Sequence, residues 1–299
     1  MQFKNKTILG ILLVALVMVT FSGCAKKGPC LECASGNASE KLKMQETTWK
    51  EINTKILENY QLGKIKEATN AANEALKFAQ KNFGKDSSQT ATALNNLGEL
   101  YRVQNKFKES ESMYKKSLDM RKKILGNDHL DVSISLNNLA TLYVLQKNHA
   151  KAEPLYKEAV TIIENKLGKW HVGLLTPLSN LVDLYKTQGK YTEAESALKN
   201  ILTIYEKANK KEDVMYPKTL NDLAAVYYLQ GKFSNAEPVF KQALSILETK
   251  LGKDSPDIAI VLENMAEMYK KLGNETKANE FSTRAQALLK PKTGSVAKS

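Results

Sequence analysis

The feature that most constrains the fold is an internal repeat with a period of 42 residues. Five segments that begin with Leu and end with Tyr recur at this spacing: LNNLGELY (94–101), LNNLATLY (136–143), LSNLVDLY (178–185), LNDLAAVY (220–227) and LENMAEMY (262–269). Each is followed by a second related segment: FKESESMYKKSL (107–118), HAKAEPLYKEAV (149–160), YTEAESALKNIL (191–202), FSNAEPVFKQAL (233–244) and ETKANEFSTRAQ (275–286). An unbroken period of this length is typical of a solenoid, in which each repeat buries its apolar side against its neighbours.

The spacing of apolar residues inside a repeat is helical. Residues 94, 97, 98 and 101 stand at i, i+3, i+4 and i+7, which makes one continuous stripe on an α-helix. The second segment continues in the same way, as in Leu198, Ile201, Leu202 and Tyr205. Between the two segments lies a turn at Asn105, a position held by Gly in four other repeats (Gly63, Gly189, Gly231 and Gly273). The sequence therefore predicts an all-α fold of about six helix-turn-helix repeats.

One column of the repeat holds only small residues: Ser110, Ala152, Ala194, Ala236 and Ala278. We expect the two helices of a repeat to cross closely at this column, because a larger side chain there would overpack the crossing.

The repeat region is predicted over residues 45–289, with repeats at about 45–86, 87–128, 129–170, 171–212, 213–254 and 255–289. The first repeat has Ile52 and Asn59 at the Leu and Tyr positions, so its first helix is either degenerate or displaced by one residue. The last has Ser282 and Gln286 at formerly apolar positions. Because terminal repeats must turn a polar side to water, the first and last repeats are predicted to be capping repeats. Residues 290–299 read as a disordered tail.

The beginning of the chain has the layout of an export signal. Lys4 and Lys6 are followed by an uncharged apolar run from Ile8 to Phe21, which is too short to span a bilayer comfortably. Residues 24–44 contain Gly, Pro, Ser and Lys with little to bury, and are predicted to form a flexible tether.

The end of the apolar run, Phe21-Ser22-Gly23-Cys24, resembles the bacterial lipobox. This resemblance implies removal of residues 1–23 as a signal peptide and acylation of Cys24, which anchors the chain to a membrane. In the sorting rule known for enterobacteria, Ala25 after the acylated Cys directs a lipoprotein to the outer membrane. The expected location is the bacterial cell envelope, with the outer membrane facing the periplasm favoured over the inner one. The alternative is an ordinary secretory signal with an incidental Cys.

The charge does not single out a partner. The formal net charge of +12 falls to +10 without the leader, because the leader holds two lysines and no acidic residue. The surplus is spread as single lysines among glutamates, which favours a solvated helical surface over binding to nucleic acid or an anionic membrane.

The motifs L-x-x-L-[GA]-x-L-Y and A-E-x-x-[YF]-x-x-[AS]-L are similar to the tetratricopeptide repeat, in the 42-residue form found in kinesin light chains. The resemblance implies a right-handed superhelix whose first helices line a concave groove for a peptide or protein partner. No cofactor, no small-molecule substrate and no nucleic acid partner are expected.

The groove residues are expected on the side of each first helix that the buried stripe leaves free: Asn95, Glu99, Arg102, Asn137, Thr141, Asp183, Lys186, Asn221, Tyr228 and Lys270. In kinesin light chains, Asn residues of the L-N-N-L segment bind the backbone of cargo peptides. Two roles stay open for Asn95, Asn137 and Asn221: binding a peptide in this way, or linking neighbouring repeats. A structural role is favoured for the next column, Asn96, Asn138, Asn180 and Asn264.

No catalytic motif is present. Of the three histidines, His129 and His171 occupy the same position in successive repeats and His149 replaces an aromatic residue, so none indicates a site. The chain lacks an HExxH motif, a Gly-rich phosphate loop and a Ser-His-Asp order, and it is predicted not to be an enzyme and to hold no metal.

Cys30 and Cys33 form a C-x-x-C pair in the tether. A local disulfide is expected in an oxidising compartment. A redox dithiol is the alternative, although the βαβ context of thioredoxin-like proteins is missing.

These features together predict a membrane-anchored adaptor that binds a protein or peptide in its groove and serves the assembly of an envelope complex. One alternative is an accessory module for a cell-wall or secretion enzyme. The other is a redox protein that uses Cys30 and Cys33.

Overall fold

A computed structural model describes residues 36–290. The predicted leader, Cys24, Cys30, Cys33 and the tail from residue 291 lie outside the described residues. The described chain divides after Asn127 into two compact parts, called here the first module (36–127) and the second module (128–290). Each is described by itself.

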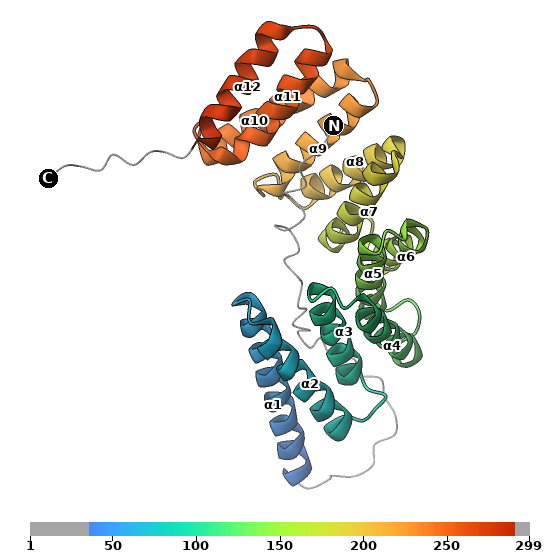
Figure 1. Ribbon diagram of the computed structural model, residues 1–299. Coiled ribbons are helices and arrows are strands. Elements are labelled where there is room, and N and C mark those ends of the chain that lie inside the picture. Colours follow the sequence, from blue (N-terminus) through green and yellow to red (C-terminus); the bar gives the residue numbers. More distant parts are fainter. Residues whose placement is uncertain (1–35, 291–299) are drawn as a thin grey trace, which may run out of the picture. The chain divides into compact units, whose positions relative to one another are not determined.

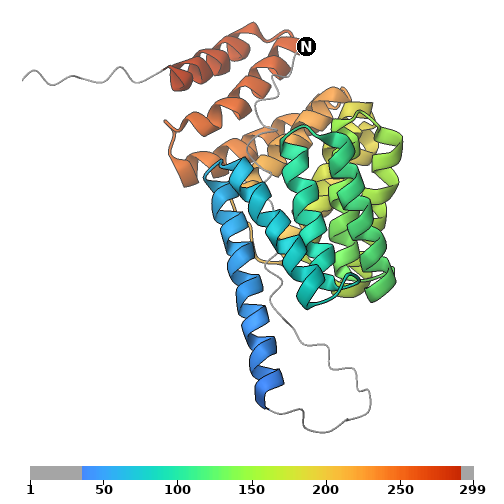
Figure 2. The same cartoon turned by 60° about the horizontal axis from the view of Figure 1, so that its bottom comes forward.

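Both modules consist of α-helices, and residues 36–290 contain no strand (Figure 1 and Figure 2). The first module holds α1 (Gly36–Gln61), α2 (Ile65–Asn82), α3 (Ser88–Val103) and α4 (Phe107–Leu125). The second holds α5 (Leu130–Leu145), α6 (His149–Leu167), α7 (Leu175–Gln188), α8 (Tyr191–Lys207), α9 (Met215–Leu229), α10 (Phe233–Leu251), α11 (Ala259–Lys271) and α12 (Glu275–Leu289). Short 3₁₀ turns, Val172–Leu174 and Pro256–Ile258, precede α7 and α11.

The 42-residue period corresponds to one helix pair. Each odd-numbered helix packs against the even-numbered helix that follows it. Within a module, that second helix also packs against the first helix of the next pair, as α2 does on α3 and α8 on α9. The predicted all-α repeat fold is confirmed. No helix between residues 36 and 290 has the length and apolarity that crossing a membrane requires.

The column of small residues lies where the paired helices cross. Ser110, Ala152, Ala194 and Ala236 are fully buried, and Ala278 is 5% exposed. In the first module the hydroxyl of Ser110 donates to the carbonyl oxygen of Gly98 over 2.7 Å. A Cβ atom at Gly98 would lie 2.6 Å from Cδ1 of Tyr114, so only glycine permits this approach without a shift of the ring. The predicted close crossing is therefore present.

The turn inside each repeat uses one left-handed residue. The φ angles are +58° at Asn105 and +59° at Lys147, and between +71° and +74° at the four equivalent glycines. Lys147 is the exception that the sequence did not indicate, because a long side chain disfavours this conformation.

The loop between repeats ends in a side chain that caps the next helix. Residues 87, 129, 171, 213 and 255 each accept a hydrogen bond from a backbone N–H at the start of the following helix. The ring nitrogens Nδ1 of His129 and His171 do so over 3.1 and 3.0 Å. The position shared by these two histidines is thus explained by helix capping.

The first repeat begins earlier than predicted, because α1 starts at Gly36, inside the segment predicted as a tether. Its register is not displaced: Lys64 N–H donates to Asn59 O, as Lys106 N–H does to Tyr101 O one period later. The helix is instead degenerate. Glu51, Lys55 and Glu58 are exposed, whereas their equivalents in α3, Ala93, Leu97 and Leu100, are 0–2% exposed. Charged residues thus replace the apolar face that would otherwise meet a preceding repeat.

The last repeat is also reduced. In α12 only Ala278 and Ala285 are buried, while Phe281 stacks on Tyr269 with ring centroids 5.5 Å apart. Leu289 is 56% exposed, although its equivalent in α10, Leu247, is 1% exposed. The polar caps predicted at both ends agree with this burial pattern.

Candidate protein-binding face

The predicted groove residues are placed differently in the two modules. In the first module, Glu99 and Arg102 of α3 are 7% and 8% exposed. In the second, Asp183 and Lys270 are exposed, and Asn137, Thr141, Lys186 and Tyr228 are partly exposed. Asn221 is only 8% exposed, so its predicted position on an open groove is wrong. We call the solvent-accessible side of α5, α7, α9 and α11 the open face. On each of these helices, the residues outside the buried apolar stripe form the open face.

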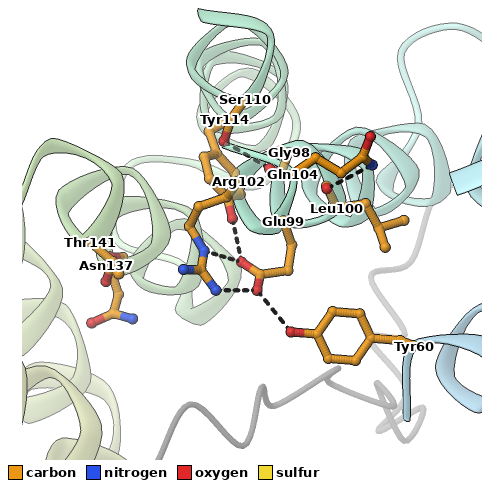
Figure 3. Close-up of polar contacts among 10 residues, drawn as sticks. All are labelled: Tyr60, Gly98, Glu99, Leu100, Arg102, Gln104, Ser110, Tyr114, Asn137 and Thr141. Atoms are coloured by element: carbon orange, nitrogen blue, oxygen red, sulfur yellow. Dashed lines mark hydrogen bonds and ion pairs between the residues drawn. The ribbon is translucent and has the colours of Figure 1, made fainter. Parts of the chain in front are cut away.

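In the first module the polar groups at the groove positions are satisfied within the protein (Figure 3). Arg102 Nε donates to Oε2 of Glu99 over 2.8 Å, and the Tyr114 hydroxyl donates to the same oxygen over 2.8 Å. The Tyr60 hydroxyl of α1 lies 3.4 Å from Oε1. The Glu99 carboxylate is therefore the acceptor at the centre of a buried network that joins α1, α3 and α4.

Burial sets the protonation of this network. It raises the pKa of Tyr114 well above its ordinary value, and the Glu99 charge raises it further. Burial alone would lower the pKa of Arg102, but the hydrogen bond and the charge of Glu99 raise it instead. Glu99 and Arg102 are consequently engaged in an internal ion pair, and their predicted role in binding a partner is untested.

The asparagine columns link neighbouring repeats. The amide of Asn180 donates to Oδ1 of Asn137 over 2.9 Å, and Asn264 donates to Asn221 over 3.0 Å. In the first module Asn96 donates to Asn53 over 3.2 Å. Both asparagine columns therefore take part in contacts between repeats. The sequence left two roles open for Asn137 and Asn221: binding a peptide or linking neighbouring repeats. The structure shows contacts for the second role. Asn95 is partly exposed on α3.

One junction between repeats departs from this pattern. Where α7 meets α9 the two columns hold Ser179 and Asp222 in place of two asparagines. Asp222 instead accepts from Nζ of Lys186 over 3.0 Å. Asp183 lies one helical turn before Lys186, so that two carboxylates stand near one ammonium group.

Asp183 lies on the open face of α7. Water reaches its side chain, yet the surrounding helices desolvate the carboxyl group and raise its pKa; Lys186 lowers that pKa and Asp222 raises it. Burial alone would lower the pKa of Lys186, but Asp222 and Asp183 raise it.

The remaining predicted residues extend the open face on either side. The Thr141 hydroxyl donates a hydrogen bond to the backbone carbonyl of Asn137 and shares another with the Tyr156 hydroxyl, each over 2.9 Å. Tyr228 packs against Phe233 with ring centroids 5.8 Å apart. Burial raises the pKa of Tyr228, and the Glu267 charge on α11 adds to this. The open face thus carries hydrogen-bonding groups, the aromatic side chain of Tyr228 and charges of both signs.

Ion clusters near the turns inside the repeats were not predicted from the sequence. Glu153 of α6 contacts Lys157 of the same helix and Lys190 of the next repeat, both over 2.7 Å. Glu195 contacts Lys199 over 2.7 Å and Lys232 over 2.9 Å in the same way. The signal was present as a column of glutamates at 153, 195 and 237, each followed four residues later by lysine.

Residues 36–290 show no grouping of His, Cys, Asp and Glu side chains that would hold a metal ion. The geometry of these residues thus offers surfaces for binding.

Comparison with known proteins identifies the repeat. The tetratricopeptide repeat model matches residues 58–123, 104–165, 131–207, 173–249 and 216–290. No curated protein matches the chain in sequence.

Solved structures share the fold at low sequence identity. BtubC (BKLC) from P. vanneervenii superposes with a TM-score of 0.63 at 19% identity, covering 79% of this chain and 90% of that one. Kinesin light chain TPR-like repeats from Podosopora anserina give 0.61 at 20% identity, over 68% and 96%. PilW, described as a widely conserved type IV pilus biogenesis factor, gives 0.57 at 19% identity, over 85% and 94%. Because the family matches together run from residue 58 to residue 290, the chain belongs to the tetratricopeptide repeat family.

Proposed function

We propose that this chain is a lipid-anchored scaffold that binds a segment of a protein partner on the open face of the second module, in the assembly of an envelope complex. Its fold is that of a general scaffold for protein or peptide binding, and no catalytic family is indicated. The observation that carries the proposal is the exposed carboxylate of Asp183 beside the Lys186–Asp222 ion pair, which joins the first helices α7 and α9 on the open face.

The chemistry of the open face suits a polypeptide. A bound segment needs donors and acceptors for its backbone and room for its side chains. Ser179, Asp183 and Glu263 are exposed there, and Tyr228 supplies an aromatic surface. PilW is a type IV pilus biogenesis factor, and the fold that the chain shares with it supports a role in assembly at the envelope.

The predicted lipobox at Cys24 supports the anchor. We expect palmitate labelling of the wild-type chain in a bacterial host and none of the Cys24→Ser variant. A wild-type chain that stays unlabelled and keeps its leader would remove the anchor from the proposal. The alternatives of an accessory enzyme module and of a redox protein using Cys30 and Cys33 stay predictions.

Site-specific photo-crosslinking in cells tests the binding face. A benzophenone amino acid is placed at Ser179 or at Glu263, both exposed on first helices. Control sites are Thr161 and Gln242, exposed on the second helices α6 and α10. We expect a partner to be captured from Ser179 and Glu263 and not from the control sites. Capture from the control sites alone would show that the partner binds another surface.

A further inference from the structure

The last repeat carries a second copy of part of the buried network of the first module. Tyr228 and Glu267 stand four periods of 42 residues after Tyr60 and Glu99. In the first module the Tyr60 hydroxyl lies 3.4 Å from Oε1 of Glu99 (Figure 3). In the second, burial raises the pKa of Tyr228 and the charge of Glu267 raises it further. In both modules, therefore, a tyrosine of one first helix lies near a carboxylate of the next.

The carboxylates at these two equivalent positions differ in what binds them. Glu99 is 7% exposed and accepts hydrogen bonds from Nε and Nη2 of Arg102, three residues later on the same helix. Lys270 stands at the position of Arg102 in the last repeat. Glu267 and Lys270 are both exposed, and the Glu267 side chain makes no hydrogen bond or ion pair with any of residues 36–290. The position that binds a guanidinium group in the first module is therefore open in the last repeat.

The residues beside Glu267 leave its carboxylate accessible and hold the neighbouring ring in place. Tyr114 donates to Glu99 over 2.8 Å, but Ser282 stands at its position in the last repeat and has no ring to cover the carboxylate. The partly exposed ring of Tyr228 packs against Phe233, with ring centroids 5.8 Å apart. The last repeat thus presents a carboxylate and a positioned aromatic ring to solvent.

We propose that Glu267 and Tyr228 together bind the guanidinium group of an arginine side chain in the partner segment. This inference rests on the proposed function, in which the open face receives that segment. A planar guanidinium group donates two hydrogen bonds to one carboxylate, as Arg102 does to Glu99, and it stacks on aromatic rings. The ammonium group of a lysine lacks this planar fork, so the pair of groups fits arginine better than lysine.

The surrounding charges direct a cation to the last repeat. Glu263 lies one turn before Glu267 and Lys270 one turn after it, and all three are exposed, so one carboxylate is in excess. A basic side chain is therefore attracted there. Asp183 stands at the equivalent position two repeats earlier, but Val144 replaces the tyrosine. In the second module the last repeat alone combines the carboxylate with the aromatic ring at these positions.

Selection from a library of randomised peptides displayed on phage tests the proposal. The immobilised full chain should enrich peptides that contain arginine, and their affinity for Glu267→Gln should be lower on the order of tenfold to a hundredfold. Glu280→Gln removes the same charge from the exposed side of α12 and should bind these peptides as the wild type does. Equal losses in the two variants would overturn the proposal.

A double-mutant cycle shows whether the arginine contacts Glu267 itself. Citrulline in place of the arginine keeps the shape of the side chain and removes its charge. This exchange should weaken binding to the wild-type chain by a factor similar to that of Glu267→Gln, and it should weaken binding to Glu267→Gln little further. Tyr228→Phe should keep the preference for arginine over lysine, and Tyr228→Leu should lose it. Losses that simply multiply in the cycle would contradict a direct contact.

Rebuilding the network of the first module should close the site from within. Lys270→Arg/Ser282→Tyr conserves the net charge and introduces the residues of Arg102 and Tyr114. The new guanidinium group should occupy Glu267, so that the arginine peptides bind at least severalfold more weakly. Thermal melts check that the variant is folded. Unchanged peptide binding by this folded variant would contradict the equivalence of the two positions, on which the proposal depends.

Photo-crosslinking from Ser179 separates failure of this inference from failure of the proposed function. If Ser179 captures a partner while the wild-type chain selects peptides without arginine, the proposed function stands and the arginine site is refuted. If Ser179 captures nothing and the chain selects no peptide, both are refuted. Capture from Ser179 that falls in Glu267→Gln and persists in Glu280→Gln supports both.

Discussion

The side-chain amide of Asn180 donates a hydrogen bond to Oδ1 of Asn137, which lies one repeat earlier in the chain. The pairs Asn96–Asn53 and Asn264–Asn221 have the same geometry. An amide carries donors and an acceptor in one group, so a single residue type can serve on both sides of this contact. The contact fixes one repeat against the next at the margin of the face where a partner is proposed to bind.

Removal of this link should destabilise the second module. Asn180→Ala leaves Oδ1 of Asn137 without this donor, and we expect a loss of ~1 kcal/mol in the free energy of unfolding. Denaturant unfolding followed by circular dichroism measures the loss. Ser179→Ala changes the neighbouring exposed residue and should have little effect. A loss as large for Ser179→Ala as for Asn180→Ala would contradict the role of the amide.

Removing one partner of the buried ion pair in the first module should strongly destabilise the folded state. Arg102→Ala leaves the Glu99 carboxylate buried without its cation, and we expect a destabilisation of about 3–5 kcal/mol. The double variant Glu99→Thr/Arg102→Val introduces the residues that α5 has at these positions, Thr141 and Val144. It should recover most of the loss in denaturant unfolding, since it removes both charges together. A double variant no more stable than Arg102→Ala would contradict this account.

The crossing of α7 and α8 should not tolerate a large side chain. Ala194 is fully buried at the crossing, and Ala194→Leu is expected to overpack it at a cost of ~1–3 kcal/mol. The melting temperature should fall clearly. Glu193→Leu, at the exposed neighbouring position, provides the control for added apolar volume. An unchanged melt of Ala194→Leu would remove the assignment of this column to the helix crossing.

The ion cluster around Glu195 should make the stability of the folded state depend on pH. The hydrogen bond from Lys199 lowers the pKa of Glu195 from 4.5 to about 2; burial opposes this, and Lys232 and Gln230 support it. A carboxyl group with a lowered pKa in the folded state contributes stability above its unfolded pKa, and this contribution is lost as the pH falls. The loss is therefore expected between about pH 4.5 and about pH 2.

Thermal melts of Glu195→Gln measure this contribution. The variant should be less stable than the wild-type chain at neutral pH, and the difference should shrink across that acidic interval. Glu193→Gln removes an exposed carboxylate from the same helix turn and controls for net charge. A difference between Glu195→Gln and the wild type that is independent of pH would refute the assignment.

The fold could be predicted from the sequence to a large extent because its determinants are local and repeated. The stripe that contains Leu97 and Tyr101 identifies a helix by itself, and the 42-residue period identifies its partners. The burial of Ala194 and the shared loop position of His129 and His171 followed from comparing equivalent positions.

The candidate site could be predicted less well, because it depends on contacts between residues far apart in the sequence. Arg102 and Glu99 have the spacing of an exposed helix face, but Tyr60 and Tyr114 cover them from two other helices. The pairing of Glu195 with Lys232 depends on how closely one repeat packs on the next. The helical period gives the side of its own helix on which a residue lies, and it does not give what packs against that side.

The charged first helix also limits how the array can grow. Glu51, Lys55 and Glu58 stand where later repeats place Ala93, Leu97 and Leu100. A duplicated repeat joined ahead of α1 would pack its leucines against these charged side chains. The charges would then be buried away from water, which is energetically unfavourable. Gene duplication can therefore lengthen this protein by insertion between existing repeats, but not by addition at the front. A head-to-tail contact of two molecules through these three positions would likewise bury their charges, which disfavours growth into an open filament by that route.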